Sequence, residues 1–391
     1  MSWFLLISIL FLGTAQVLAD PDPISRGPWS PKSFTITNPA MDSSDQRIFV
    51  TVPDLENQHV DVWDPEYWLT DRSFPLISYA HGLNNAAAED YNTLFDALAS
   101  WGFVTIAHHA CKSGCSDDYT SLWWDPPGFG HYYKQQLLAI DFALDELPGS
   151  YGINLDVSGG VGIAGHSMGG QSALFASSYD NITATKVPIT AAVFHHAFSH
   201  EFPAPQVPFL SFTGEQDFVA PPWMSRSIFN ATRGARNTVR SKGHANKVSA
   251  GHLENQDWEN AGWVGDWYNP LVPQFTAAWF KVHLERKTHE FGVDWEELIY
   301  GDGPSAMCSG GNGVMEECDM RDGRMADLVL IDWWESLSEE DKKLLIAGAS
   351  GALLFVVLVV SLGCCCGRKA KRDGGARGGG GAGAMHRVQM V

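Results

Sequence analysis

Positive charge is scarce in this chain, which has 26 lysine and arginine residues against 45 aspartate and glutamate residues and a formal net charge of −19. Six of the basic residues follow Cys366, so the rest of the chain carries 20 basic and 44 acidic residues. A surface of that charge repels phosphate groups, which disfavours nucleic acids and anionic lipid surfaces as partners. The acidic excess instead suits a domain that stays soluble outside the cell.

Two stretches lack charged side chains altogether. The first, residues 1–19, is apolar from Phe4 and ends in small residues before Asp20, which is the pattern of a cleaved signal peptide. The second, residues 344–363, has 20 residues. At about 1.5 Å per residue, a helix of that length spans a hydrocarbon core of about 30 Å. The sequence therefore predicts a signal peptide and one transmembrane helix.

The charges that flank the second stretch predict its orientation. Acidic residues precede it at 339–341, and a basic run follows it at 368–372. By the positive-inside rule the C-terminal tail is cytosolic, and the residues between the two stretches are extracellular or lumenal. A basic, glycine-rich tail disfavours the alternative, a glycosylphosphatidylinositol anchor. We expect a single-pass type I protein of the plasma membrane or of a secretory-pathway membrane.

Cysteine is also rare, with seven residues in three groups. In an oxidising compartment, the first two groups predict local disulfides because their members are close in sequence. A zinc site would need a second pair of close cysteines, so we expect no metal and no cofactor. The third group lies at the cytosolic end of the predicted span and is typical of S-palmitoylation. The groups are Cys111 with Cys115, Cys308 with Cys318, and Cys364, Cys365 and Cys366.

The two uncharged stretches and the arrangement of apolar and helical runs between them divide the chain into six segments. Between residues 46 and 300, apolar runs typical of buried strands alternate with helical runs, which predicts an α/β domain with a mostly parallel sheet and helices on both faces. This domain contains two sequons, which predict N-glycosylation at Asn181 and Asn230. The segments are a signal peptide (1–19), an irregular arm (20–45), the α/β domain (46–300), a glycine-rich stalk (301–343), a transmembrane helix (344–363) and a cytosolic tail (364–391).

The most informative motif is Gly165-His166-Ser167-Met168-Gly169-Gly170. It follows the apolar run 160–164 and leads into a predicted helix at 171–177. Strand, tight G-x-S-x-G turn and helix form a nucleophile elbow, in which small residues on either side of the serine let the strand and helix approach closely. The N–H groups that start the helix face any oxyanion formed there. Ser167 is therefore the predicted nucleophile.

Two further residues follow in the order nucleophile, acid, histidine. Asp217 comes after a strand-like run, and His252 lies in a loop and is preceded by glycine. Glu215 is the alternative acid, and His244 is the alternative histidine. In the predicted triad His252 takes the proton of Ser167, while Asp217 holds the imidazole tautomer and stabilises its cation.

A fourth element is the loop after the buried strand predicted at 74–80, which reads His81-Gly82-Leu83. In enzymes with a nucleophile elbow, a loop of this kind supplies one donor of the oxyanion hole, and the residue after the nucleophile supplies the other. The expected donors are the backbone N–H groups of Leu83 and Met168.

Over about residues 45–300 the chain resembles the dienelactone-hydrolase-like clan of α/β-hydrolases. FPLISYAHGLNN at 74–85, the helix and WGFVTIA that follow it, and the later GHSMGG carry this resemblance. Within the clan the chain is similar to the PET-hydrolase and cutinase-like polyesterases, the platelet-activating-factor acetylhydrolases and the chlorophyllases. The run FTAAWFK at 275–281 resembles the last helix of the polyester hydrolases.

The resemblance implies an α/β-hydrolase fold and carboxylic ester hydrolysis through an acyl-enzyme. Ser167, Asp217 and His252 match the triad positions of the family. Two features depart from the family: Leu83 stands where it has tyrosine or phenylalanine, and the loop 111–130 is longer and rich in tryptophan. We expect a membrane-anchored extracellular esterase that acts on lipid-like or polyester-like esters.

Side chains near these motifs are the candidates for substrate contact. In polyester hydrolases, an aromatic residue after the strand that ends here at Phe194 contacts the substrate. Packing of the long loop onto the domain is the alternative role. The histidines of this region show no metal-ligand pattern with a carboxylate, so we expect no metal here either. The candidates are Trp123, Trp124, His196 and Phe198.

Two other functions stay open at this point. One is a non-catalytic adhesion or receptor module on a hydrolase fold, although such modules generally lose the nucleophile or the histidine. The other is a chlorophyllase-type or acetylhydrolase-type esterase of narrower specificity.

Overall fold

The computed structural model describes residues 26–41, 45–56, 72–85, 90–111, 132–232, 241–257, 269–309 and 315–322. All of them belong to one compact unit, Met1–Arg324. Among these residues, no helix has the length and the apolar character needed to cross a bilayer. Several predictions concern residues outside the described ones, namely the signal peptide (1–19), the transmembrane helix (344–363), Cys115, Trp123, Trp124 and Cys364, Cys365 and Cys366.

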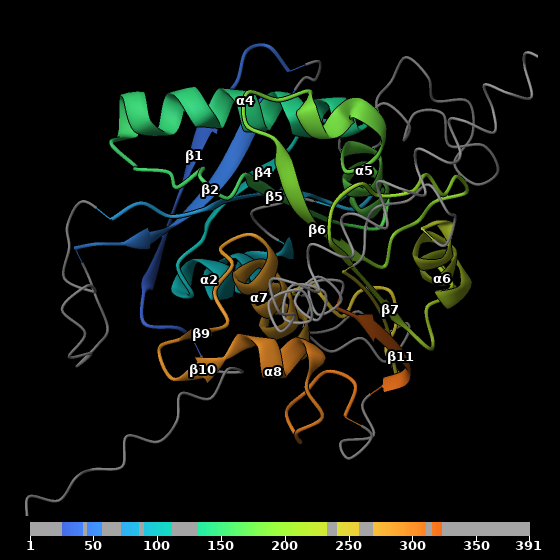
Figure 1. Ribbon diagram of the computed structural model, residues 1–391. Coiled ribbons are helices and arrows are strands. Elements are labelled where there is room, and N and C mark those ends of the chain that lie inside the picture. Colours follow the sequence, from blue (N-terminus) through green and yellow to red (C-terminus); the bar gives the residue numbers. More distant parts are fainter. Residues whose placement is uncertain are drawn as a thin grey trace, which may run out of the picture. The chain divides into compact units, whose positions relative to one another are not determined.

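The described residues form a central sheet in the order β1-β2-β4-β3-β5-β6-β7-β8-β11 (Figure 1). The six strands from β4 to β8 in this order are parallel, whereas β1, β2 and β11 are antiparallel at the two edges. The predicted mostly parallel α/β sheet is therefore confirmed. The strands are β1 (Ser30–Thr37), β2 (Arg47–Asp54), β3 (Leu76–Ala80), β4 (Val104–His108), β5 (Val161–His166), β6 (Ile189–His195), β7 (Phe209–Gly214), β8 (Lys242–Lys247) and β11 (Met315–Arg321).

Helices cover both faces of the sheet. In Figure 1, α4 and α5 lie on one side of the strands and α2, α7 and α8 lie on the other. The described helices are α2 (Asn92–Ser100), α4 (Tyr132–Tyr151), α5 (Met168–Ala176), α6 (Pro222–Ala231), α7 (Leu271–His283) and α8 (Trp295–Tyr300), with a 3₁₀ turn η3 (Tyr179–Thr183) and a short hairpin of β9 (His289–Glu290) and β10 (Val293–Asp294).

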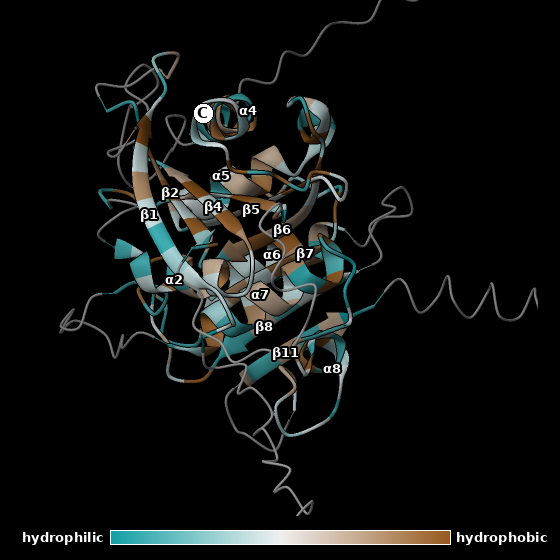
Figure 2. Cartoon of the chain, turned by 90° about the vertical axis from the view of Figure 1, so that its left-hand side faces the viewer, coloured by the Kyte–Doolittle hydropathy of each residue, from teal (hydrophilic) through white to brown (hydrophobic). Residues whose placement is uncertain are grey.

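Each face of the sheet packs into its own hydrophobic core, because successive side chains of a strand point to opposite faces. On β3, Leu76 and Ala80 join the core beneath α4 and α5, whereas Ile77 and Tyr79 join the core beneath α2 and α7. Strands buried on both faces are mostly apolar, as the brown parts of β5 and β6 show in Figure 2, although these strands end in His166 and His195. The edge strand β1 is more hydrophilic in the same view.

The domain extends further than the sequence indicates. Residue 300 is the predicted end of the domain, yet β11 lies within the predicted stalk and pairs with β8 from Met315 to Arg321. A disulfide between Cys308 and Cys318 ties this strand to the segment after α8. The sequence of β11, MEECDMR, lacks the alternation of a half-buried strand, and this strand lies at an edge of the sheet with its side chains at most partly buried.

The turn between β5 and α5 needs glycine for close packing. A Cβ atom on Gly165 would lie 2.1 Å from the carbonyl oxygen of Gly169, and a Cβ on Gly169 would lie 1.9 Å from the carbonyl oxygen of Ala80. Both obstacles are backbone atoms, so neither can move away without shifting a strand. The glycines of the G-x-S-x-G motif therefore set the distance between α5 and the sheet.

We expect Gly169→Ala to destabilise the domain by at least about 3 kcal/mol, because the added methyl group forces β3 and α5 apart. Gly149→Ala is the matched control, since Gly149 lies in α4 and nothing stands within 4 Å of its Cβ position. This control should be neutral or gain up to about 1 kcal/mol from helix propensity. Urea denaturation of both variants measures the difference, and equal midpoints would contradict this account of the turn.

Candidate active site

The ends of three parallel strands bring the predicted triad together. Ser167 follows β5, Asp217 follows β7 and His252 follows β8, all at the edge where the parallel strands end. The imidazole Nε2 of His252 lies 2.9 Å from Ser167 Oγ, and its Nδ1 lies 2.8 Å from Asp217 Oδ2. These are hydrogen-bonding distances for a nucleophile, a base and an orienting carboxylate.

Ser167 has the backbone of a nucleophile elbow. Its φ of 56° and ψ of −116° are strained for a residue with a side chain. Three backbone hydrogen bonds hold this conformation: the N–H of Ser167 donates to His195, and its carbonyl oxygen accepts from Gln171 and Phe198. The strain is thus supported from both α5 and the loop after β6.

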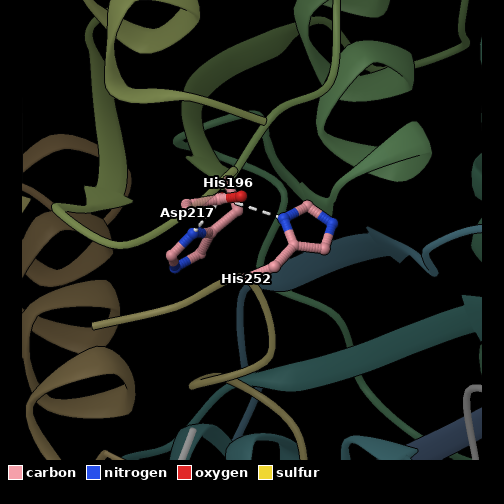
Figure 3. Close-up of side chains that lie close together, drawn as sticks. All are labelled: His196, Asp217 and His252. Atoms are coloured by element: carbon pink, nitrogen blue, oxygen red, sulfur yellow. Dashed lines mark hydrogen bonds and ion pairs between the residues drawn. The ribbon is translucent and has the colours of Figure 1, made fainter. Parts of the chain in front are cut away.

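Asp217 is held by four donors. Its Oδ1 accepts from the backbone N–H groups of Val219 and Ala220, at 2.9 and 2.7 Å. Its Oδ2 accepts from the Nδ1 atoms of His252 and His196, both at 2.8 Å (Figure 3). Burial raises the pKa of Asp217, but the neighbouring histidines and their hydrogen bonds outweigh burial and keep it well below the usual range. Asp217 is therefore ionised.

The alternative acid and the alternative histidine lie elsewhere. Glu215 is exposed, and its Oε2 accepts from the backbone N–H of Ser249 at 3.0 Å. His244 lies within β8, and its Nδ1 is 2.9 Å from Ser225 Oγ. Burial lowers the pKa of His244 to about 4, so its ring is neutral at pH 7.

Ser225 and His244 form a second serine–histidine pair, with Glu317 at 3.4 Å from His244 Nε2. This pair lacks the features that make a nucleophile. Ser225 lies inside α6 rather than on a sharp turn, is 2% exposed, and shares its hydroxyl with Ser211 at 2.6 Å. The pair therefore serves as an internal comparison for Ser167.

The two predicted oxyanion donors lie in the loop after β3 and at the start of α5. Met168 is the first residue of α5, so its N–H has no acceptor within the helix. Leu83 lies in a turn closed by a 3.1 Å hydrogen bond from the N–H of Asn85 to the carbonyl oxygen of Gly82. The next residue, Asn84, has a φ of 62°, which turns the chain back.

His166 and Tyr91 connect these loops, a link that no motif in the sequence predicts. Tyr91 Oη accepts from the N–H of Gly82 at 3.0 Å and donates to His166 Nδ1 at 2.8 Å. The opposite nitrogen, Nε2, donates to the carbonyl oxygen of His252 at 2.8 Å. Burial and the nearby histidines lower the pKa of His166 well below its usual value, so the ring stays neutral. The middle residue of G-H-S thus joins the loop after β3 to the loop that carries His252.

His196 takes a different place from the predicted one. Instead of facing a substrate, its side chain is completely buried and lies against Asp217 on the side opposite to His252 (Figure 3). Its Nε2 lies 3.1 Å from Oε1 of Glu254. Burial alone would lower the pKa of His196, but the hydrogen bonds and charges of Asp217 and Glu254 raise it to about 9. The sequence pattern missed Glu254, which lies two residues after His252.

Other predicted residues have simpler positions. Phe198 is half-buried beside the elbow, where its N–H donates to Ser167, so it stays a candidate for substrate contact.

Cys111 is disulfide-bonded. Asn230 lies near the end of α6, and the side-chain amide of Asn181 donates to the carbonyl oxygen of Phe175 at 2.9 Å.

The nitrogen and oxygen atoms of His196, Asp217 and His252 lie within 4.8 Å of one another, a residue set that could also bind zinc. Their spacing favours hydrogen bonds instead. Two ligands of a tetrahedral zinc with bonds of about 2.0–2.1 Å are about 3.3 Å apart, whereas both imidazole nitrogens lie 2.8 Å from the carboxylate oxygen. This arrangement therefore does not fit a zinc ion.

No protein-family model matches this chain, and a search of curated proteins finds no match either.

The charge on His196 predicts a pH-dependent stability. Its pKa of about 9 in the folded protein exceeds the ordinary histidine value of 6.5. Its contribution is therefore fully present below about pH 6.5 and is lost as the pH rises through about 9. A shift of this size corresponds to about 3 kcal/mol.

We expect the melting temperature of the parent protein to fall between pH 6.5 and 9, and that of His196→Asn to fall less. His195→Asn is the matched control. His195 is equally buried and donates to Thr276, but its pKa is lowered to about 3, chiefly by burial, so it is neutral throughout this range. Parallel melting curves for the parent and His196→Asn across this range would show that His196 carries no charge.

Proposed function

We propose that this chain is a serine hydrolase that cleaves carboxylic esters through an acyl-enzyme. The observation that carries the proposal is the hydrogen-bonded series Ser167, His252 and Asp217, with the serine on a strained turn at the start of a helix. The loop after β3 and the elbow after β5 suit the two-donor oxyanion hole of an α/β-hydrolase, and the chain order of the three residues matches that fold.

In this mechanism Ser167 Oγ attacks the ester carbonyl while His252 Nε2 takes the hydroxyl proton. The carbonyl oxygen becomes an oxyanion that accepts from the N–H groups of Met168 and Leu83, and each donor lowers the barrier by about 3–4 kcal/mol. His252 then returns its proton to the leaving alcohol as the ester bond breaks. Water attacks the acyl-enzyme by the same route and releases the acid and free Ser167.

An ester with a large apolar part fits the surroundings of the site. Phe218, next to the catalytic acid, is 67% exposed, and Trp223 at the start of α6 is 52% exposed. Phe202 contacts Trp223 with 6.0 Å between the ring centroids. Phe218 and Trp223 follow Asp217 closely in the chain, and exposed aromatic side chains favour hydrophobic ligands, which supports lipid-like or polyester-like esters.

We further propose that the domain works outside the cytosol, anchored by the apolar segment 344–363 as a type I protein. The disulfide between Cys308 and Cys318 supports an oxidising compartment. The charge pattern around that segment supports the same orientation.

A fluorophosphonate probe tests the nucleophile directly. We expect it to label the full-length protein and to fail on Ser167→Ala, because the probe reacts only with an activated serine. Ser225→Ala is the matched control and should be labelled like the parent, since Ser225 has a histidine partner but no elbow. A folded parent that resists the probe would favour a non-catalytic adhesion or receptor module.

Asp217→Asn and Glu215→Gln distinguish the two candidate acids. Asp217→Asn should lower kcat for p-nitrophenyl butyrate by about 10³–10⁴-fold, because an amide can favour the wrong tautomer of His252. Glu215→Gln should leave kcat close to that of the parent, since this side chain lies at the surface. The reverse ranking would assign the acid to Glu215.

The same assay with longer p-nitrophenyl esters, a phospholipid, a polyester film and chlorophyll then separates the substrate classes.

A further inference from the structure

One oxygen of Asp217 serves two imidazole rings. Oδ2 lies 2.8 Å from Nδ1 of His252 and 2.8 Å from Nδ1 of His196. His196 also turns its Nε2 towards Glu254, at 3.1 Å. Both nitrogens of His196 therefore face carboxylate oxygens, and only a doubly protonated ring can donate to both of them. The hydrogen-bonded series of the triad thus extends by two residues and runs through Ser167, His252, Asp217, His196 and Glu254.

The far end of this series is anchored in the protein. Glu254 is 1% exposed, and its Oε2 accepts from Asn269 Nδ2 at 2.9 Å and pairs with Lys247 Nζ at 3.1 Å. Burial raises the pKa of Glu254, but its contacts with His196, Lys247 and Asn269 outweigh burial and lower it. The titratable and charged groups that face His196 are Asp217, Glu254, His166, His195 and His252, with Lys247 behind Glu254.

We propose that His196 is a positioning residue that stays positively charged throughout catalysis and, held by Glu254, sets the pH range in which His252 acts as a base. This inference rests on the proposed function. The ring centroids of His196 and His252 are 5.8 Å apart. A fixed positive charge at that distance opposes the formation of a second positive charge on His252.

His196 also fixes the direction of the carboxylate. Its hydrogen bond meets Asp217 from the side opposite to His252, and the two backbone donors hold the other oxygen. No proton leaves His196 in the reaction. The proton taken from Ser167 stays on His252 until the leaving alcohol receives it.

The pH profile of kcat/KM tests the inference. His196→Asn keeps a donor towards Asp217 and removes the charge. We expect the acid limb of the profile for p-nitrophenyl butyrate to move to higher pH by about one unit, with KM little changed. His195→Asn, from the same strand end and equally buried, should leave the acid limb where it is in the parent. A purely structural role for His196 would lower activity at every pH alike.

A second measurement needs no catalysis. In the full-length Ser167→Ala chain labelled with ¹⁵N-histidine, we expect one histidine to stay doubly protonated at pH 8, and this signal to vanish in the further variant His196→Asn. Glu254→Gln should make the same ring titrate at least about one unit lower, because a neutral amide replaces a carboxylate. If His196→Asn does not fold, the shift in Glu254→Gln alone tests the inference.

The outcomes separate this inference from the proposed function. A parent that the fluorophosphonate probe does not label would overturn the proposed function and its pH control together. If the probe labels the parent but no histidine is doubly protonated at pH 8, this inference alone is overturned. The same holds if the probe labels the parent and His196→Asn leaves the acid limb of the pH profile unmoved.

Discussion

The carboxylate of Asp217 is the group on which the rest of the site depends. A buried carboxylate is costly to desolvate, and it is tolerated here because four donors surround it. Two of them come from loops after other strands: His196 follows β6 and His252 follows β8. One oxygen atom therefore holds three neighbouring loops at fixed distances. Removing this charge would leave two histidines without their common partner and the loops without their shared contact.

Several buried histidines cluster around this point, and their protonation states differ for identifiable reasons. His166 and His195 each meet neutral partners, a tyrosine and a carbonyl oxygen in one case and a tyrosine and a threonine in the other. Burial then keeps both rings neutral. His196 alone of these three lies between two carboxylates, which hold its second proton. Among these three histidines the positive charge is thus confined to His196, because only its hydrogen-bond partners are carboxylates.

The sequence predicted the parts of this architecture that are encoded locally. The alternation of strands and helices indicated the mostly parallel sheet, and the glycines around Ser167 indicated a tight turn whose close packing the structure explains. The positions of Asp217 and His252 followed from loops that come after strands. The role of His196 did not follow, because its partner Glu254 is 58 residues away in sequence and meets it only through the convergence of two loops. β11 was missed because edge pairing makes little demand on side-chain pattern.

The place of β11 has a mechanical consequence. Tension applied from the C-terminal side reaches the domain through this strand, which lies antiparallel along β8, with Arg321 opposite Lys242. Pulling at Arg321 would peel the backbone pairs apart one at a time, which is the weaker way to load a sheet. The bond from Cys318 to Cys308 lies only three residues along that path. Unzipping therefore stops at a covalent link before the remaining pairs of β11 with β8, from Cys318 to Met315, are lost.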